Sequence, residues 1–321
     1  MMAQSYDVIL KGGMVVNQDG SGERDIAVRD RRIVAISSST EPLTGAAAQT
    51  IECKGLHVLP GVIDSQVHFR EPGLTHKEDL ATGSQAAVLG GVTVVFEMPN
   101  TNPLTTTPQA LADKVAAARG RMACDFAFYV GGTRENIDDI PELERLEASA
   151  GMKIFMGSST GNLLVDDEES LDRIIARLSR RAAFHSEDEA RLIAREGVRR
   201  TGDPTTHPEW RDPEAAMIST RRLVRLAEKH GRRVHVLHIS TGHEIEFLAA
   251  HKSWASVEVT PNHLTLTAPE CYERLGTYAQ MNPPVRDASH QARIWQGVRD
   301  GTVDVLGSDH APHTREEKDH A

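Results

Sequence analysis

Hydrophobic and polar residues alternate over residues 6–58, and the pattern changes after that point. The alternation predicts short strands in YDVILKGGMVV, DIAVRDRRIVAI and QTIECKGLHVL. Gly12-Gly13 and Asp30-Arg31-Arg32 are turn signals between such strands. We interpret residues 1–58 as a small antiparallel β unit, the N-terminal half of a sandwich-like domain, with no chemistry of its own.

From Gly61 onward, an apolar strand, a polar tip and a helical segment repeat along the chain. The first predicted strand ends at His68, and seven more follow in GGVTVVFEMPN, DFAFYVGG, MKIFMGSSTG, RAAFHSED, RVHVLHIST, SVEVTPNHL and TVDVLGSDHAPH. Helical periodicity lies between them, at Lys77–Leu89, Pro108–Arg119, Asp166–Arg180, Glu187–Arg199, Pro213–His230, Gly242–Ala250 and Ser289–Arg299.

Strands that alternate with helices of this length predict parallel βαβ units. Polar residues follow nearly every strand, and barrel enzymes place their active sites at that end. We therefore predict that residues 59–321 form a TIM-like (β/α)8 barrel of the metal-dependent hydrolase type.

The predicted barrel is incomplete at its C-terminal end. Ala321 follows soon after the eighth strand, so no eighth helix is left to cover that strand. We expect from this that the C-terminal part of the domain is missing and that the chain as given has poor stability.

Composition and charge exclude several classes of function. The chain of 321 residues carries a formal charge of −10 and has no basic patch with interleaved aromatic residues, which argues against nucleic-acid binding. It has neither a signal-peptide pattern nor an apolar run of membrane-spanning length. Cys53, Cys124 and Cys271 are odd in number and widely spaced, which argues against a disulfide framework. We expect a cytoplasmic protein.

The first strand of the barrel carries the most informative residues. In GVIDSQVHFREPG, the residues Gln66, His68 and Arg70 occupy alternate positions and share one face of the strand. A single histidine there is usually a core residue. Matching ligands, however, follow three later strands at His185, His238 and Asp309.

Imidazole nitrogens and carboxylate oxygens are ligands that suit zinc and similar divalent ions. Such an ion lowers the pKa of bound water from about 15.7 to roughly 7. Asp309 is the candidate general base, which would take a proton from the attacking water and return it to a leaving nitrogen.

Seven motifs connect the chain with a known family. They are HFREPG (68–73), EMPNTNP (97–103), MKIFMGSSTG (152–161), HSED (185–188), HIST (238–241), MNPPVR (281–286) and GSDHAPH (307–313). With them the chain resembles the amidohydrolase superfamily and its cyclic amidohydrolase branch. The greatest similarity is to the dihydroorotase family, in the class that has a carboxylated lysine.

The resemblance implies a pair of divalent metal ions, most often Zn²⁺, and a modified lysine. In this family the lysine at the position of Lys153 reacts with carbon dioxide to give an N6-carboxylated side chain that bridges the metals. The resemblance implies one metal among His68, Lys153 and Asp309, and another among Lys153, His185 and His238. From the residue type alone, Lys153 is a salt-bridge partner, since an ammonium group has no lone pair to offer a metal.

The resemblance also implies a binding site for a substrate carboxylate. It assigns that role to Arg70, Asn100 and His313, with Asn282 nearby. An arginine side chain forms a bidentate pair with a carboxylate, whereas a neutral ring gives it no partner. The alternative for Arg70 and Asn100 is a solvated surface residue and a turn residue.

Gln66 departs from the family pattern, which has a histidine at this position. Because an amide oxygen is a poorer zinc ligand than an imidazole, three outcomes follow. The first metal position is weakened, or the enzyme uses only the second position, or activity is lost. Since His68, Lys153, His185, His238 and Asp309 are all retained, we favour an active enzyme with an unequal metal pair.

Three functions stay open. The first is reversible hydrolysis of dihydroorotate to N-carbamoyl-aspartate, in pyrimidine biosynthesis. The second is hydrolysis of another cyclic amide, as by a hydantoinase, a dihydropyrimidinase or an allantoinase. The third is a non-catalytic subunit that supports aspartate transcarbamoylase. For the partners we expect a small carboxylated cyclic amide and a homodimer.

Overall fold

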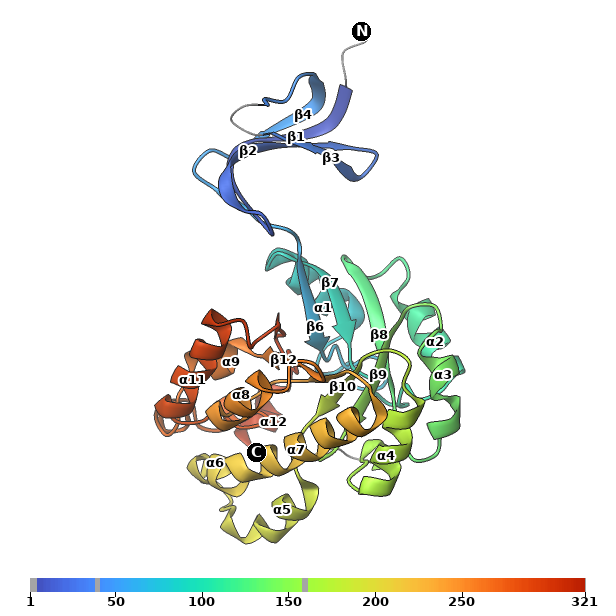
Figure 1. Cartoon of the computed structure of the whole chain (residues 1–321), viewed down its shortest axis with the longest axis vertical. Helices are drawn as coiled ribbons and strands as arrows, with labels where there is room; N and C mark the ends of the chain where they lie inside the picture. The colour runs from blue at the N-terminus through green and yellow to red at the C-terminus, as the bar shows by residue number, and fades with distance from the viewer. Residues whose placement is uncertain (1–4, 38–40, 158–160, 321) are drawn as a thin grey trace. The chain divides into compact units, whose positions relative to one another are not determined.

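A computed structural model describes residues 5–37, 41–157 and 161–320, which are arranged in two compact units (Figure 1). The first unit extends to Val62 and the second begins at Ile63. Within the described residues, no helix has the length and apolar character that crossing a membrane requires.

The N-terminal unit is a small sheet. Its strands are β1 (Ser5–Asn17), β2 (Gly20–Arg29), β3 (Arg32–Ile36), β4 (Ala46–Glu52) and β5 (His57–Val58). The order is β3-β2-β1-β4, and β5 also pairs with β1. The hairpin between β2 and β3 turns at Asp30 and Arg31, which both have positive φ, as a tight two-residue turn requires. The prediction of a purely antiparallel unit is wrong, because β4 and β5 pair with β1 in parallel.

The second unit is a barrel, as predicted. Within the described residues, eight strands form one sheet in the order of the chain. They are β6 (Val62–Val67), β7 (Val92–Glu97), β8 (Asp125–Gly131), β9 (Ser149–Phe155), β10 (Ala182–His185), β11 (Val234–Val236), β12 (Ala255–Val259) and β13 (Val305–Leu306). A parallel bridge between Val67 and His310 links the first strand to the segment after the last and nearly closes the barrel.

Helices follow the strands of the barrel and cover it (Figure 1). The longer ones are α1 (Leu80–Leu89), α2 (Pro108–Ala118), α4 (Glu168–Arg177), α7 (Pro213–His230), α8 (Gly242–Ala249) and α11 (Ala288–Arg299). Each begins after an Asp or Thr whose side chain accepts a hydrogen bond from the first turn. The remaining helices span six residues or fewer: α3 (Ile140–Leu143), α5 (Glu189–Ala194), α6 (His207–Trp210), α9 (Pro261–Thr265), α10 (Glu270–Leu275) and α12 (Arg315–Asp319).

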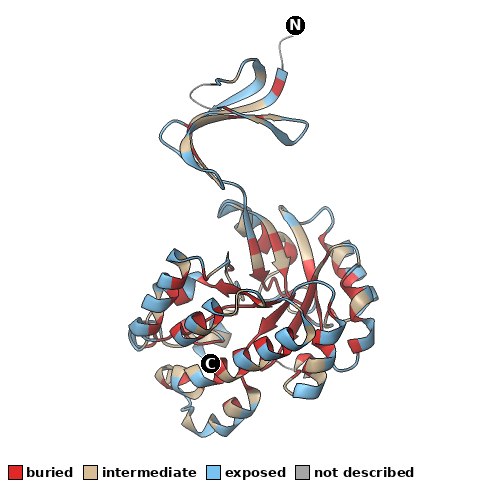
Figure 2. Ribbon diagram, in the orientation of Figure 1, coloured by how far each residue is buried: buried red, intermediate tan, exposed pale blue. Residues whose placement is uncertain are grey.

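The hydrophobic core lies between the strands and this layer of helices. Helix α4 shows the principle, because it buries Leu171, Ile174 and Ile175 and exposes most of its charged residues (Figure 2). Each such side chain contributes about 1.5–3 kcal/mol on burial. The core fixes the strands, and the strands fix the positions of the polar residues that follow them.

Candidate active site

The carboxyl ends of the barrel strands bring all the predicted site residues to one cavity. It has a volume of about 830 Å³ and an open mouth. Gln66 lies on β6, Lys153 on β9 and His185 at the end of β10, while His238 and Asp309 follow β11 and β13. Its lining includes every predicted metal and substrate residue: Gln66, His68, Arg70, Asn100, Lys153, His185, His238, Asn282, Asp309 and His313.

Three of these residues have a backbone conformation that side chains disfavour. Arg70, His238 and Asp309 have φ values of 67°, 37° and 51°. Positive φ costs a non-glycine residue on the order of 1–3 kcal/mol and is concentrated at functional sites. The fold therefore holds these side chains toward the cavity at some cost in stability.

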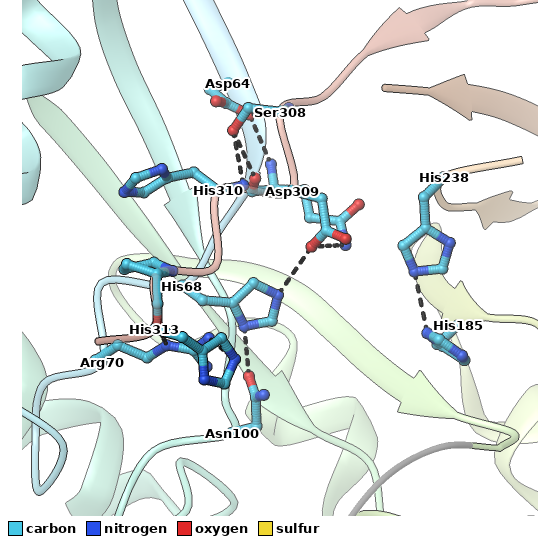
Figure 3. A network of polar contacts seen from close by, with 12 residues as sticks. Asp64, His68, Arg70, Asn100, His185, His238, Ser308, Asp309, His310 and His313 are labelled. Atoms are coloured by element: carbon cyan, nitrogen blue, oxygen red, sulfur yellow. Dashed lines mark hydrogen bonds and ion pairs between the residues drawn. The ribbon is translucent and has the colours of Figure 1, made fainter. Parts of the chain in front are cut away.

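His68 and Asp309 form one pair of facing donor atoms (Figure 3). The Nδ1 of His68 lies 2.8 Å from the Oδ1 of Asn100, an oxygen that can only accept, so Nδ1 carries the hydrogen. Burial lowers the pKa of His68, so the neutral ring has a lone pair at Nε2. That nitrogen lies 3.2 Å from the Oδ1 of Asp309. Two lone pairs at this distance repel each other unless a cation lies between them.

Gln66 contacts the same carboxylate. Its Nε2 donates a hydrogen bond of 2.9 Å to the Oδ1 of Asp309. The Oε1 of Gln66 is buried and has no hydrogen-bond partner among the described residues. The amide thus has one oxygen left to offer a ligand in the cavity.

His185 and His238 form a second pair, with 3.0 Å between Nδ1 of His185 and Nε2 of His238 (Figure 3). The Nε2 of His185 lies 2.8 Å from the Oε2 of Glu187 and donates to it. Burial raises the pKa of Glu187, but the adjacent Arg211 and His185 outweigh burial and bring it to about 2. Glu187 is therefore ionised, and it leaves Nδ1 of His185 as the nitrogen with a free lone pair.

Lys153 is buried in the same cavity, with its Nζ 4.4 Å from the centre of the Phe155 ring. Burial lowers the pKa of Lys153 to about 7. Near neutral pH a substantial share of these side chains is therefore the uncharged amine, which has a lone pair.

The donor atoms form two separate pairs, and each pair has a spacing that suits one divalent ion. Tetrahedral zinc ligands at about 2.0–2.1 Å from the metal lie roughly 3.3 Å from each other. The two pairs described above are separated by 3.2 and 3.0 Å. In the part of the chain that the structure describes, no three His, Cys, Asp or Glu side chains converge on one metal position. Lys153 and Gln66 line the same cavity and are candidates for a third ligand.

Arg70 is held against the segment that follows Asp309. Its Nε donates to the carbonyl of Pro312 at 3.0 Å, and its Nη2 lies 3.3 Å from the Nε2 of His313. Its Nη1 has no hydrogen-bond partner among the described residues and is available to a ligand. Arg70 is buried, so the alternative of a solvated surface residue is wrong.

Asn100 and His313 have partners that the sequence does not reveal. Asn100 accepts from His68, so it positions a candidate metal ligand as well as lining the cavity. His313 contacts Arg70 directly. Asn282 also lines the cavity.

Several residues that contact the predicted site residues are not identified by the sequence motifs. Glu187 lies two residues after His185 in HSED, and this spacing is a signal that could have found it. Arg211, its ion-pair partner, comes from a loop without any motif. His235 and His263 are buried and bonded to Ser256 and to the carbonyl of Pro283. His310 lines the cavity.

The chain is similar to known proteins over nearly its whole length. The model of the Amidohydrolase family matches residues 57–317. A dihydroorotase from Methanosarcina mazei is 33% identical over 325 residues, which cover 97% of this chain and 70% of that protein. An L-hydantoinase from Paenarthrobacter aurescens is 32% identical over 329 residues, which cover 98% of this chain and 70% of that protein.

The fold is similar to that of a solved hydantoinase. An L-hydantoinase (dihydropyrimidinase) from Arthrobacter aurescens superimposes with a TM-score of 0.91 at 30% identity, covering 98% of this chain and 71% of that one. The chain therefore spans about seven tenths of the length of these relatives.

Proposed function

This chain belongs to the amidohydrolase family and, within it, to the hydrolases of cyclic amides, and we propose that its substrate is dihydroorotate. The reaction is reversible hydrolysis of the ring amide to N-carbamoyl-aspartate, a step of pyrimidine biosynthesis. The observation that carries this proposal is the buried guanidinium of Arg70 in the same cavity as the metal-ligand pairs. A buried cation needs an anion, and the carboxylate of dihydroorotate supplies one.

The donor set supports two zinc sites of unequal strength. His185 and His238 supply two imidazoles to one, whereas His68, Asp309 and the poorer ligand Gln66 supply the other. Lys153 would serve both after reaction with carbon dioxide, which requires its uncharged amine. Zinc bound there supplies Lewis acidity, so that water loses a proton near neutral pH.

Asp309 is the proposed general base. Its Oδ1 accepts from Gln66 and faces the Nε2 of His68, and its Oδ2 has no hydrogen-bond partner among the described residues. Oδ2 would take the proton of the attacking water and return it to the ring nitrogen that leaves. Arg70 would hold the carboxylate through Nη1, and Asn100 and Asn282 would line the ring.

The test is hydrolysis of dihydroorotate by purified protein loaded with zinc and bicarbonate. We expect turnover in the wild type, and a loss of at least about a hundredfold in Asp309→Asn, because removing a general base costs about 10²–10⁴. If the wild type has zinc bound, is supplied with bicarbonate and is still inactive, the proposal is refuted.

A second candidate is hydrolysis of a neutral ring such as hydantoin. The similarity to the two hydantoinases favours it. Hydantoin and dihydrouracil therefore belong in the same assay, and faster turnover of either would reverse our choice of substrate. A non-catalytic subunit that supports aspartate transcarbamoylase is the third proposal, and a protein that retains no metal would favour it.

A further inference from the structure

Glu317 of helix α12 contacts His313, which lines the cavity, and also contacts Lys77. Its Oε2 lies 3.1 Å from the Nδ1 of His313 and accepts from the backbone N–H of Thr314 at 3.2 Å. Its Oε1 lies 3.0 Å from the Nζ of Lys77, in the loop that follows β6. The HSED and GSDHAPH motifs do not include this residue, and the catalytic scheme does not use it.

The contacts of His313 determine which of its nitrogens carries the hydrogen. The Nη2 of Arg70 can only donate, so the Nε2 of His313, 3.3 Å away, must be the acceptor. Nδ1 of the neutral ring then carries the hydrogen and needs an acceptor of its own. Lys77, 3.4 Å from Nδ1, is a cation and cannot accept. Glu317 is the acceptor that remains.

We propose that Glu317 is a positioning residue for Arg70, acting through His313. Its carboxylate holds His313 in the tautomer with hydrogen on Nδ1, and the free Nε2 then holds the guanidinium of Arg70 in place. This inference rests on the proposed function, in which Arg70 binds the substrate carboxylate. In this view His313 orients Arg70, in addition to any direct contact that it makes with the substrate.

The other tautomer would disturb the carboxylate site. With hydrogen on Nε2, His313 would direct an N–H at an N–H of Arg70, and the two groups would repel each other. The Nε of Arg70 would keep its bond to Pro312, so the guanidinium would pivot about that contact. Lys77 pairs with Glu317 and helps to keep the carboxylate ionised.

The first test is kinetic. In Glu317→Ala we expect the KM for dihydroorotate to rise about tenfold with little change in kcat, because the hydrogen bond that fixes the tautomer of His313, and through it the position of Arg70, is lost. In Glu317→Gln we expect a smaller rise, since the amide oxygen still accepts from Nδ1. Glu316→Ala, on the same helix, is the matched control.

Glu317 also belongs to the capping box of α12. A second control is therefore needed to distinguish its role in capping the helix from its role in positioning His313. Thr314→Ala removes the N-cap side chain and leaves the acceptor for His313 in place. If Thr314→Ala raises KM as much as Glu317→Ala, the effect is fraying of the helix and the proposal is wrong.

The second test does not depend on any substrate. Long-range ¹H–¹⁵N NMR distinguishes the two neutral tautomers, and the His313 signal is identified by its absence in His313→Gln. We expect the Nδ1–H tautomer in the wild type and a shift toward Nε2–H in Glu317→Ala. An unchanged tautomer in that variant would overturn the proposal. If dihydroorotate is not turned over at all, the proposed function fails, while this measurement still decides the role of Glu317.

Discussion

Replacement of Arg70 by methionine is the sharpest test of substrate choice. Methionine keeps most of the apolar volume of the arginine stem and removes every donor. The side chain of Arg70 is buried, so solvent does not screen the interaction that is lost. The barrel should keep its fold, because the partners of Arg70 are one carbonyl and one imidazole at the cavity mouth.

The magnitude follows from the donors that remain free. Nε and one N–H of Nη2 are engaged by Pro312 and His313, which leaves Nη1 and the second N–H of Nη2 for a carboxylate. Two hydrogen bonds to a charged group, at about 1.5–3 kcal/mol each, give about 3–6 kcal/mol. In kcat/KM this corresponds to a loss of about 10²–10⁴ for dihydroorotate.

The assay compares dihydroorotate with hydantoin in the wild type and in Arg70→Met. We expect the loss for dihydroorotate alone, with the hydantoin rate within about threefold of wild type, since a neutral ring makes no charge-assisted bond to Arg70. Arg119→Met, which removes a surface pair with Glu147, is the control. Equal losses on both substrates, or none on either, would refute the role given to Arg70.

Three further predictions follow from the buried polar groups. Gln66→His should tighten the weaker of the two zinc sites by at least about tenfold, measured by equilibrium dialysis in zinc buffers; two equally tight sites in the wild type would contradict this. Bicarbonate should increase zinc retention in the wild type and have no effect in Lys153→Met, by elemental analysis after desalting. Lys114→Met should lower the free energy of unfolding by about 3–5 kcal/mol, because it leaves the buried carboxylate of Glu97 without its cation.

The last of these predictions also has a pH dependence of known sign. Burial raises the pKa of Glu97 to about 7 even with Lys114 present, and without Lys114 it rises further. The folded variant then binds a proton that the unfolded chain releases near pH 4.5. The variant should therefore lose stability as the pH rises from 4.5 through the folded pKa, in urea titrations. A destabilisation that shrinks with rising pH would show that Glu97 is not the group responsible.

The barrel could be predicted because its signals are local. Each strand is a short apolar run, and helices such as α7 have both apolar periodicity and an Asp cap. The short helices α6 and α12 lack a full apolar stripe, since they have only four and five residues. The pairing of β4 with β1 was missed because parallel pairing inside a small sheet leaves no local signal.

The candidate site was predictable in its residues and not in its contacts. His68, His185 and Asp309 could be found because they end strands, and strand ends meet at one face of a barrel. Their orientation depends on groups from distant segments. Arg211 reaches Glu187 from a loop 24 residues further along the chain, and His313 contacts Arg70, which is 243 residues away in the sequence. Such contacts arise only when the fold is complete.

Zinc content per chain tests the central claim most directly. The claim is that ligands from distant strands converge on a divalent cation between His185 and His238, and more weakly between His68 and Asp309. After incubation with zinc and bicarbonate and then desalting, the wild type should retain at least one zinc per chain. The His185→Ala variant, with His238→Ala as a second case, should lose the tightly held ion. A wild type that retains no zinc, or variants that retain as much as the wild type, would contradict the account.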